Sequence, residues 1–426
     1  MAAQPQPETV LSFEDARRVV EQQALHIPPC GTETVDLLAS NGRVLAEAIT
    51  ADRDFPPFRR AARDGYAVQS GDLQQLPAAL KIVGEIRAGA MPDSIPALEQ
   101  GHAALIMTGA AAPAGADAIV MVEYTSRSGD EVTIMRGVES GANIVDIGSE
   151  AHRGDRLIAR GTRLDYVAIS VAASVGRSQI LVYAKPRVAV LATGDEIVDI
   201  DQHPGPTQIR NSNTYSLAAQ IRAAGGEAVL LPTALDEPGA LREAIAQGLQ
   251  SDLLLMAGGV SMGKYDFVEQ VLAGFQAEFL FTGARIQPGK PVVFGRVPYA
   301  AASLPHPVNS SENSQRYFFG LPGNPVSTMV TFELFARPML EALAGQTPRK
   351  LAFLHARLKS EIVTKPGLKR FLPAALSGEF ERSEVELVRW GGSGDIAAAA
   401  HANCYVVVPP DRERIARGEW VAVLPR

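Results

Sequence analysis

The sequence predicts a protein of several domains, arranged around a doubly wound and mainly parallel α/β sheet. A length of 426 residues is more than one hydrophobic core usually organises. Between residues 184 and 345, short apolar runs alternate with helical patterns, as in a parallel sheet covered on both faces. On either side, strand-like alternation with many turn residues predicts β-rich modules. The hydrophobic fraction of 46% and the charged fraction of 20% are those of a packed globular protein.

The N-terminal segment opens with a predicted helix. Ser12 can cap this helix, and Ala16, Val19, Val20 and Leu25 form an apolar stripe. From residue 51 to about 149, short apolar runs alternate with Gly, Pro and Asp, which predicts a β-rich module with many turns. A second helical pattern then covers residues 164–175.

The central region is expected to follow a βα pattern. Strands are predicted at 187–192, 227–231, 252–257, 278–281, 292–294 and 317–319, with helices from 213, from 236, around 268–272 and from 324. The interval 298–316 has no periodicity, so we expect an exposed excursion there. The tail from about residue 351 alternates apolar and polar residues, which predicts a small β-barrel or sandwich.

Charge and cysteine usage disfavour several functional classes. The net charge of −7 disfavours nucleic-acid binding through a basic surface. Two cysteines without paired spacing and seven scattered histidines offer neither a disulfide framework nor a local chelating motif. The N-terminus does not resemble a signal peptide, and no apolar stretch approaches the ~20 residues of a membrane span. We therefore expect a soluble, cytoplasmic protein.

Three strand-to-helix junctions of the central region carry more polar residues than simple loops need. Because ligands bind at the carboxyl ends of strands in open α/β sheets, these junctions predict one common site. The candidate residues are Thr193, Gly194 and Glu196 in the first junction, Gly258, Gly259, Ser261 and Asp266 in the second, and Pro322, Gly323 and Asn324 in the third.

Each junction also has a purely structural interpretation. Pro322-Gly323 suits a tight turn and Asn324 a helix cap, yet the same helix start is a natural phosphate site. Several carboxylates near such a site suggest Mg²⁺, although Asp236 taken alone is better explained as a helix cap. Lys290, in a Pro-Gly turn, is either an oxyanion contact or a solvated lysine.

Seven motifs occur in order along the chain. They are Asp-Gly-Tyr-Ala with Asp64, Ile-Met-Thr-Gly-Ala with Thr108, Thr-Gly-Asp-Glu, Gly-Gly-Val-Ser-x-Gly-x-x-Asp, Pro-Gly-Lys-Pro, Leu-Pro-Gly-Asn-Pro-Val-Ser, and Gly-Ser-Gly-Asp with Ser393. Taken alone, the first, second and last indicate only turns. The ordered set closely resembles the molybdopterin molybdenumtransferases, a family that includes the C-terminal domain of gephyrin. The resemblance runs from about residue 10 to the end of the chain.

The resemblance implies a reaction, a fold and an assembly. Molybdenum would be inserted into adenylylated molybdopterin, with Mg²⁺-dependent release of AMP and with molybdate as the second substrate. The implied domains are a discontinuous helical linker (8–50 and 150–183), an inserted β-rich module (51–149), a molybdopterin-binding α/β domain (184–345) and a C-terminal β-barrel (346–426). The implied assembly is a homodimer that contacts the molybdopterin adenylyltransferase and molybdoenzyme assembly factors, but neither nucleic acid nor membrane.

The resemblance also implies roles for individual residues. Those matching positions needed for activity are Asp64, Thr108, Glu196, Asp236, Asp266 and Ser393, with Glu196 and Asp266 as metal ligands. Those expected to bind the pterin or the nucleotide phosphate are Thr193, Gly194, Ser212, Gly258, Gly259, Ser261, Lys290, Pro322, Gly323 and Asn324.

The chain departs from the family pattern at the expected molybdate pocket. Two lysines of some relatives align with Gly283 and Gln287, and Arg285 and Lys290 are the nearby cations. A C-terminal arginine of some relatives aligns with Pro373, close to Lys369 and Arg370. Two other functions stay open: a pterin adenylyltransferase, which usually lacks the flanking modules, and a gephyrin-like scaffold that binds receptor peptides.

Overall fold

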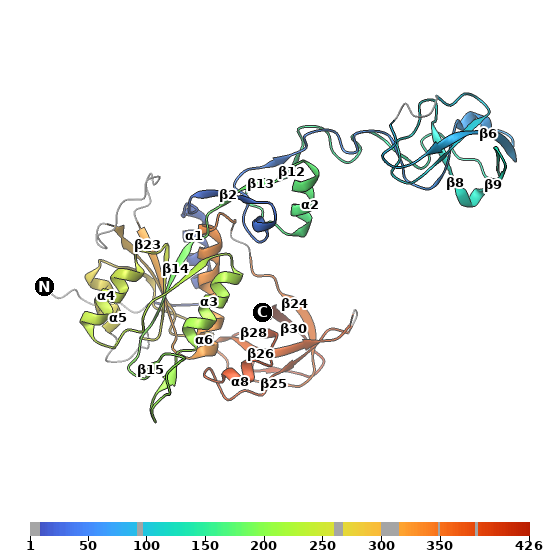
Figure 1. The fold of residues 1–426 in the computed structure, drawn as a ribbon. Coiled ribbons are helices and arrows are strands. Elements are labelled where there is room, and N and C mark those ends of the chain that lie inside the picture. The colour runs from blue at the N-terminus through green and yellow to red at the C-terminus, as the bar shows by residue number, and fades with distance from the viewer. Residues whose placement is uncertain (1–8, 92–96, 260–266, 300–314, 348–349, 380–381) are drawn as a thin grey trace. The chain divides into compact units, whose positions relative to one another are not determined.

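The computed structural model describes residues 9–91, 97–259, 267–299, 315–347, 350–379 and 382–426. The chain forms two compact units, one made of the segments up to residue 46, 161–165 and from residue 180 on, the other of 47–160 and 166–179. The first unit holds the α/β sheet and the C-terminal barrel, and the second holds a separate sheet (Figure 1). The four domain boundaries expected from the sequence stay a prediction.

A six-stranded sheet organises the first unit. Its order is β17 (Glu227–Leu230), β14 (Arg187–Ala192), β18 (Leu253–Ala257), β23 (Gln315–Leu321), β22 (Val293–Pro298) and β19 (Glu278–Phe281). The first four strands are parallel to one another, whereas β22 is antiparallel to both β23 and β19. The predicted mainly parallel sheet is therefore confirmed, and the carboxyl ends of four strands meet at one edge.

Helices cover both faces of this sheet (Figure 1). The helices are α1 (Phe13–His26), α3 (Asn213–Ala223), α6 (Pro325–Thr331) and α7 (Arg337–Leu343) on one side, and α4 (Pro238–Gly248) and α5 (Phe267–Gly274) on the other. Along β18, Leu253 and Leu255 join the core on the first side, and Leu254 and Met256 join the core on the second. This strand is apolar at every position because both of its faces are buried.

The N-terminal helix α1 begins where the sequence predicted. Ser12 is its N-cap, and the Ser12 Oγ accepts a hydrogen bond from the Asp15 N–H at 3.1 Å. The prediction that Leu25 belongs to the buried stripe is wrong, because this side chain is 65% exposed. Ala24 and Arg17 are buried instead.

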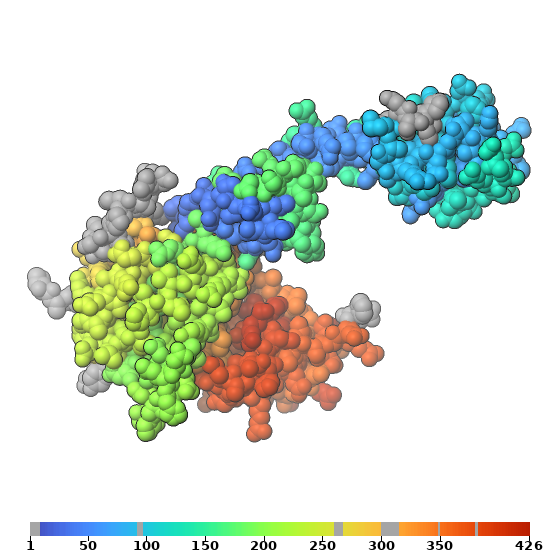
Figure 2. Space-filling model, in the orientation of Figure 1, coloured from blue at the N-terminus to red at the C-terminus, as the bar shows by residue number. Residues whose placement is uncertain are grey.

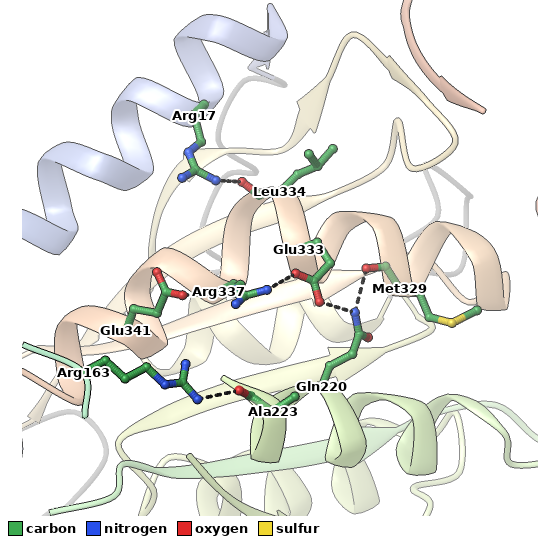
Figure 3. A network of polar contacts seen from close by, with 9 residues as sticks. All are labelled: Arg17, Arg163, Gln220, Ala223, Met329, Glu333, Leu334, Arg337 and Glu341. Carbon is green, nitrogen blue, oxygen red and sulfur yellow. Dashed lines mark hydrogen bonds and ion pairs between the residues drawn. The ribbon is translucent and has the colours of Figure 1, made fainter. Parts of the chain in front are cut away.

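The helix after β23 continues from α6 through a π-helical segment (Phe332–Ala336) into α7. Arg17, which is only 7% exposed, donates from Nη1 to the Leu334 carbonyl at 2.5 Å (Figure 3). From α3, Gln220 Nε2 donates to Glu333 Oε1 at 2.9 Å. Side chains of α1 and α3 thus fix the helix whose first turn reaches the carboxyl edge of the sheet.

The interval 298–316, expected to be an excursion, begins and ends inside paired strands. Pro298 pairs with Gln315, and Val297 pairs with Arg316, at the open end of the β22–β23 pair. The pairing therefore extends beyond both predicted limits, and residues 300–314 lie outside the described part of the chain.

The C-terminal segment forms a closed five-stranded barrel, as the alternating tail predicted. Its strands are β24 (Leu354–Leu358), β26 (Lys369–Ser377), β27 (Glu384–Leu387), β28 (Cys404–Val408) and β30 (Trp420–Pro425). A short strand of the sheet domain, β21 (Ile286–Gln287), pairs in parallel with the start of β26. Figure 2 shows the orange and red surface of the barrel lying against the yellow-green surface of the sheet domain.

The second unit contains another six-stranded sheet. Its order is β8 (Ala118–Met121), β5 (Gly65–Val68), β7 (His102–Ile106), β6 (Ala78–Ile86), β10 (Glu131–Ile134) and β9 (Thr125–Ser128). Apolar residues fill both of its faces, with Ile119 and Ile106 in one core and Val120 and Val132 in the other. The nine-residue helix α2 (Tyr166–Ser174) also belongs to this unit. Among all described residues, no helix is long and apolar enough to cross a bilayer.

Candidate functional site

Loops at the carboxyl ends of β14, β17, β18 and β23 enclose a cavity of about 510 Å³, which we call the strand-end pocket. It is lined by many of the expected site residues: Thr193, Gly194, Glu196, Ser212, Asp236, Gly258, Gly259, Pro322, Gly323 and Asn324. Ser261 and Asp266 lie outside the described residues. The structure therefore brings all three predicted junctions to one place.

The loop after β18 crosses very close to the loop after β14. Gly258 has φ +99°, and a Cβ there would lie 2.7 Å from the Thr193 carbonyl oxygen. Gly259 has φ +65°, and a Cβ there would lie 2.6 Å from Thr193 Oγ1. Both positions need glycine for backbone conformation and for space. Thr193 itself is only 4% exposed, so the crossing forms the floor of the pocket.

Carboxylates crowd one side of the strand-end pocket. Gly194 has φ +140°, and a Cβ there would lie 2.6 Å from Glu196 Oε2. The Asp195 carboxylate accepts a hydrogen bond from the Asp236 N–H at 3.2 Å. Burial raises the pKa of Asp236, and the charges of Asp195 and Glu196 raise it further. The pocket therefore holds negative charge that a cation can neutralise.

The structure decides against the helix-cap interpretation of Asp236. Helix α4 begins at Pro238, and its N-cap is Glu237. The helix start predicted at residue 236 is therefore wrong, and Asp236 lines the pocket instead. Across the described residues, no three His, Cys, Asp or Glu side chains converge as a complete metal site. Glu196 and Asp236 supply two oxygen-ligand side chains at most here.

The third junction is joined to the barrel. Asn324 is the N-cap of α6, but its Nδ2 donates to Ser393 Oγ at 2.9 Å. The Ser393 carbonyl accepts a hydrogen bond from the Val326 N–H at 3.0 Å. The predicted helix start with free N–H groups is therefore wrong for Val326. Asn213 Nδ2 holds the same loop from α3, donating to the Gly323 carbonyl at 2.6 Å.

A second cavity of about 330 Å³, the barrel-side pocket, shares Pro291, Pro322 and Asn324 with the first. Its other lining residues include Gln287, Lys290, Leu368 and Ser393. Lys290 is exposed and Ser393 is half-buried. The expected site residues thus fall into two adjoining cavities. The described candidate residues of the three strand-to-helix junctions line the strand-end pocket, whereas Lys290 and Ser393 line the barrel-side pocket.

Arg370 does not line the barrel-side pocket, but it bonds two residues that do. It is only 7% exposed, and its Nε donates to Gln287 Oε1 at 2.8 Å and its Nη1 to the Leu368 carbonyl at 3.2 Å. Burial lowers the pKa of Arg370. Both of these partners are neutral, and within the described ranges Arg370 forms no ion pair with a carboxylate. A buried cation without a counter-charge is costly and favours an adjacent anion.

Asp64 and Thr108 form a pair in the second unit. The Asp64 carboxylate accepts hydrogen bonds from the Thr108 N–H at 2.6 Å and from Thr108 Oγ1 at 2.7 Å. They meet because Gly65 pairs with Ile106 in the antiparallel β5–β7 ladder. These two bonds lower the pKa of Asp64, so the exposed carboxylate stays ionised.

Two pocket residues, Arg210 and Asn213, were not among the candidates that the sequence offered, although both line the strand-end pocket. Arg370, which the sequence placed near the expected molybdate pocket, bonds Gln287 of the barrel-side pocket. The dense polar run after the short strand ending at Arg210 was a usable signal. Nothing in the sequence pairs Arg370 with Gln287, because they come from different domains.

Known proteins match the chain along nearly its whole length. Family models match residues 11–176 (MoeA N-terminal region, domain I and II), 189–342 (probable molybdopterin binding domain) and 355–425 (MoeA C-terminal region, domain IV). A molybdopterin molybdenumtransferase from Nostoc sp. is 34% identical over 402 residues, which is 92% of this chain and 88% of the relative. The chain belongs to the molybdopterin molybdenumtransferase (MoeA) family.

Solved MoeA structures agree with this assignment. The molybdopterin biosynthesis MoeA protein from Pyrococcus horikosii is 30% identical, with a TM-score of 0.72 over 98% of this chain and 99% of its own. A second, from Pyrococcus horikoshii OT3, is 26% identical, with a TM-score of 0.78 over 98% of this chain and all (100%) of its own. The family resemblance in the ordered motifs is confirmed.

Proposed function

We propose that this MoeA-family chain is a transferase that inserts molybdenum into molybdopterin, taking adenylylated molybdopterin and molybdate as substrates. The observation that supports this most is the strand-end pocket, where the three predicted junctions meet beside crowded carboxylates. Gly258 and Gly259 line this pocket without side chains of their own, and the hydroxyl of Ser212, which also lines it, is available to orient a phosphate group.

The proposed reaction releases AMP and depends on Mg²⁺. The negative charge that raises the pKa of Asp236 is the kind that Mg²⁺ neutralises, and carboxylates with phosphate oxygens are its usual ligands. Glu196 and Asp266 are the proposed ligands. When bound, Mg²⁺ would supply neutralisation of the charge on the cleaved phosphoanhydride. Glu196 and Asp236 line the pocket where that bond would lie.

Molybdate is proposed to occupy the barrel-side pocket. The buried charge of Arg370 and the exposed Lys290 would attract an oxyanion, and the Ser393 hydroxyl can donate to it. Gln287, which aligns with a lysine of some relatives, would act by holding the Arg370 guanidinium. The positive charge of this pocket would then come partly from the barrel.

The direct test is release of AMP from adenylylated molybdopterin, with and without molybdate and Mg²⁺. Glu196→Gln should slow release by at least ~10²-fold, equivalent to ~2.7 kcal/mol. Glu227→Gln is the matched control, because Glu227 is exposed at the start of β17, the opposite end of the sheet. Full activity in excess EDTA would exclude the metal, and absence of AMP release from the wild type would exclude the reaction.

A homodimer is also proposed, with Asp64 acting on the partner's site. Tyr166 and Val167 of α2 are 83% and 53% exposed, which supports a protein-covered surface there. Asp64→Asn and Asp266→Asn variants should then complement when mixed. Random mixing would leave one intact site in each heterodimer and restore about a quarter of wild-type activity. An inactive mixture in which heterodimers are shown to form would mean that Asp64 acts within its own subunit or not at all.

The alternatives are less well supported. The family models at residues 11–176 and 355–425 correspond to the modules that a pterin adenylyltransferase usually lacks. Among the residues that the structure describes, no specific contact favours a receptor-peptide scaffold. The cytoplasmic location and the contacts with the adenylyltransferase and with molybdoenzyme assembly factors stay predictions.

A further inference from the structure

The strand-end pocket has an uneven distribution of charge. Its charged lining residues in the described part of the chain are Glu196, Asp236 and Arg210. The two carboxylates lie beside Asp195, whereas Arg210 is the one cation that this part of the chain contributes to the lining. A positive side chain would repel a metal ion, so a site for a metal ion alone does not explain Arg210. Its presence in the lining points to an anionic group of the ligand.

Arg210 is carried on a two-stranded ribbon formed by β15 (Ile197–Val198) and β16 (Ile209–Arg210). The ribbon starts directly after Glu196, and the Ile209 N–H donates to the Glu196 carbonyl at 2.9 Å. The Asn211 N–H donates to the Val198 carbonyl at 2.8 Å. Carboxylate and guanidinium therefore come from one hydrogen-bonded element, which sets their spacing.

The guanidinium of Arg210 is oriented but not neutralised. Its Nε donates to the Gln202 carbonyl at 3.1 Å, which fixes one edge of the planar guanidinium group. In residues 9–91, 97–259 and the later described segments, Arg210 forms no ion pair with a carboxylate, and neither Glu196 nor Asp236 is bonded to it. The side chain is exposed at the pocket. Its terminal nitrogens can therefore bind a tetrahedral oxyanion in two-point geometry.

We propose that Arg210 binds the phosphate of the nucleotide substrate in the strand-end pocket and determines the pocket's preference for a phosphorylated ligand. This inference rests on the proposed function, since it assumes an adenylylated substrate. Arg210 would then bind some oxygens of the phosphate chain directly, and the carboxylates would hold other oxygens of the same chain through the proposed Mg²⁺. The arginine contact exists before and during cleavage, so its loss should raise KM more than it lowers kcat.

The test is calorimetric titration of the full chain with AMP and with adenosine. For Arg210→Ala, the Kd for AMP should rise at least about tenfold while the Kd for adenosine stays unchanged, because adenosine lacks the phosphate. Arg210→Lys should lose less affinity for AMP than the alanine variant, since lysine keeps the positive charge but lacks the planar guanidinium group that binds at two points. Arg222→Ala is the matched control, because Arg222 is an exposed arginine near the end of α3, outside the pocket lining.

Each outcome has a distinct meaning. Equal AMP affinity in the wild type and in Arg210→Ala would overturn the inference while leaving the nucleotide substrate intact. Equal losses for AMP and adenosine would also overturn it, because Arg210 would then only shape the ribbon. A wild-type protein that binds neither compound would contradict the proposed nucleotide substrate itself, and the inference would fail with it. Melting curves of the variants check that all of them are folded.

Discussion

Replacing Gly258 by alanine tests how tightly the floor of the strand-end pocket is built. The residue lies in the loop that follows β18, with φ +99°. An added Cβ would lie 2.7 Å from the Thr193 carbonyl oxygen and 3.3 Å from Thr193 Oγ1. The first of these atoms is main chain at the end of β14, so it cannot rotate away. The loop itself must move.

Two contributions set the expected loss in the free energy of unfolding of Gly258→Ala. A non-glycine residue at such a dihedral angle costs roughly 1–3 kcal/mol. The close contact with Thr193 adds about 1–3 kcal/mol, as for other overpacked sites. We therefore expect Gly258→Ala to lower the free energy of unfolding by about 2–6 kcal/mol. A displacement of about 1 Å in a substrate-positioning loop commonly costs ~10²-fold in rate, so AMP release should fall by about that factor.

Two other glycines separate the contributions. Gly89 has φ +83° but no atom within 4 Å of an added Cβ, so Gly89→Ala should show the dihedral cost alone. Gly239 lies in α4 with nothing within 4 Å, so Gly239→Ala should stabilise by about 0.5–1 kcal/mol. Urea denaturation measures all three variants, and AMP release is measured in parallel. A Gly258→Ala protein as stable as Gly89→Ala, with wild-type AMP release, would refute the close-contact reasoning.

Three further predictions concern single side chains. Arg17→Ala should lower the free energy of unfolding by about 2–3 kcal/mol, because the buried Leu334 carbonyl loses its donor; denaturant unfolding measures this. Thr108→Val should raise the pKa of Asp64 towards its ordinary value, as followed by carboxyl NMR, because one of two hydrogen bonds to the carboxylate is lost. Asp236→Asn should make the metal-free protein slightly more stable at neutral pH, because it removes a carboxylate whose charged form is disfavoured by burial and by Asp195 and Glu196; thermal melting measures this. The same variant should release AMP more slowly, which a turnover assay measures.

The pH dependence of Asp236 and Asp64 has opposite signs. The raised pKa of Asp236 means that its charged form is disfavoured in the folded protein, so this cost is present above the folded pKa and disappears as pH falls. The lowered pKa of Asp64 contributes stability above its unfolded pKa, and that contribution is lost as pH falls through the folded value.

Each of the three predictions has an outcome that contradicts it. The control for Arg17 is Arg18→Ala, an exposed arginine with an exposed ion pair, which should change stability by less than ~0.5 kcal/mol. Equal effects of the two arginine variants would contradict the buried-carbonyl argument. An unchanged Asp64 pKa in Thr108→Val would assign the shift to the main-chain bond. A less stable metal-free Asp236→Asn protein would show that this carboxylate is not under electrostatic strain.

The sequence by itself determined the elements whose signals are local. Ser12 caps α1 because the residue and the N–H that it bonds are three positions apart. β18 could be predicted because burial on both faces requires apolar residues at every position. The ordered motifs gave the family and the three junctions, since each motif lies within a few residues. The sheet-edge location then followed from the general rule for α/β folds.

Only the tertiary structure decided the contacts between distant segments. The Ser393 carbonyl takes the N–H of Val326, and Arg370 holds Gln287, across strands that pair two domains. The exposure of Leu25 and the start of α4 beyond Asp236 also depend on what packs against each segment. Short-range sequence patterns do not specify these partners, because a hydrogen bond or a buried charge depends on atoms that only the folded chain brings together.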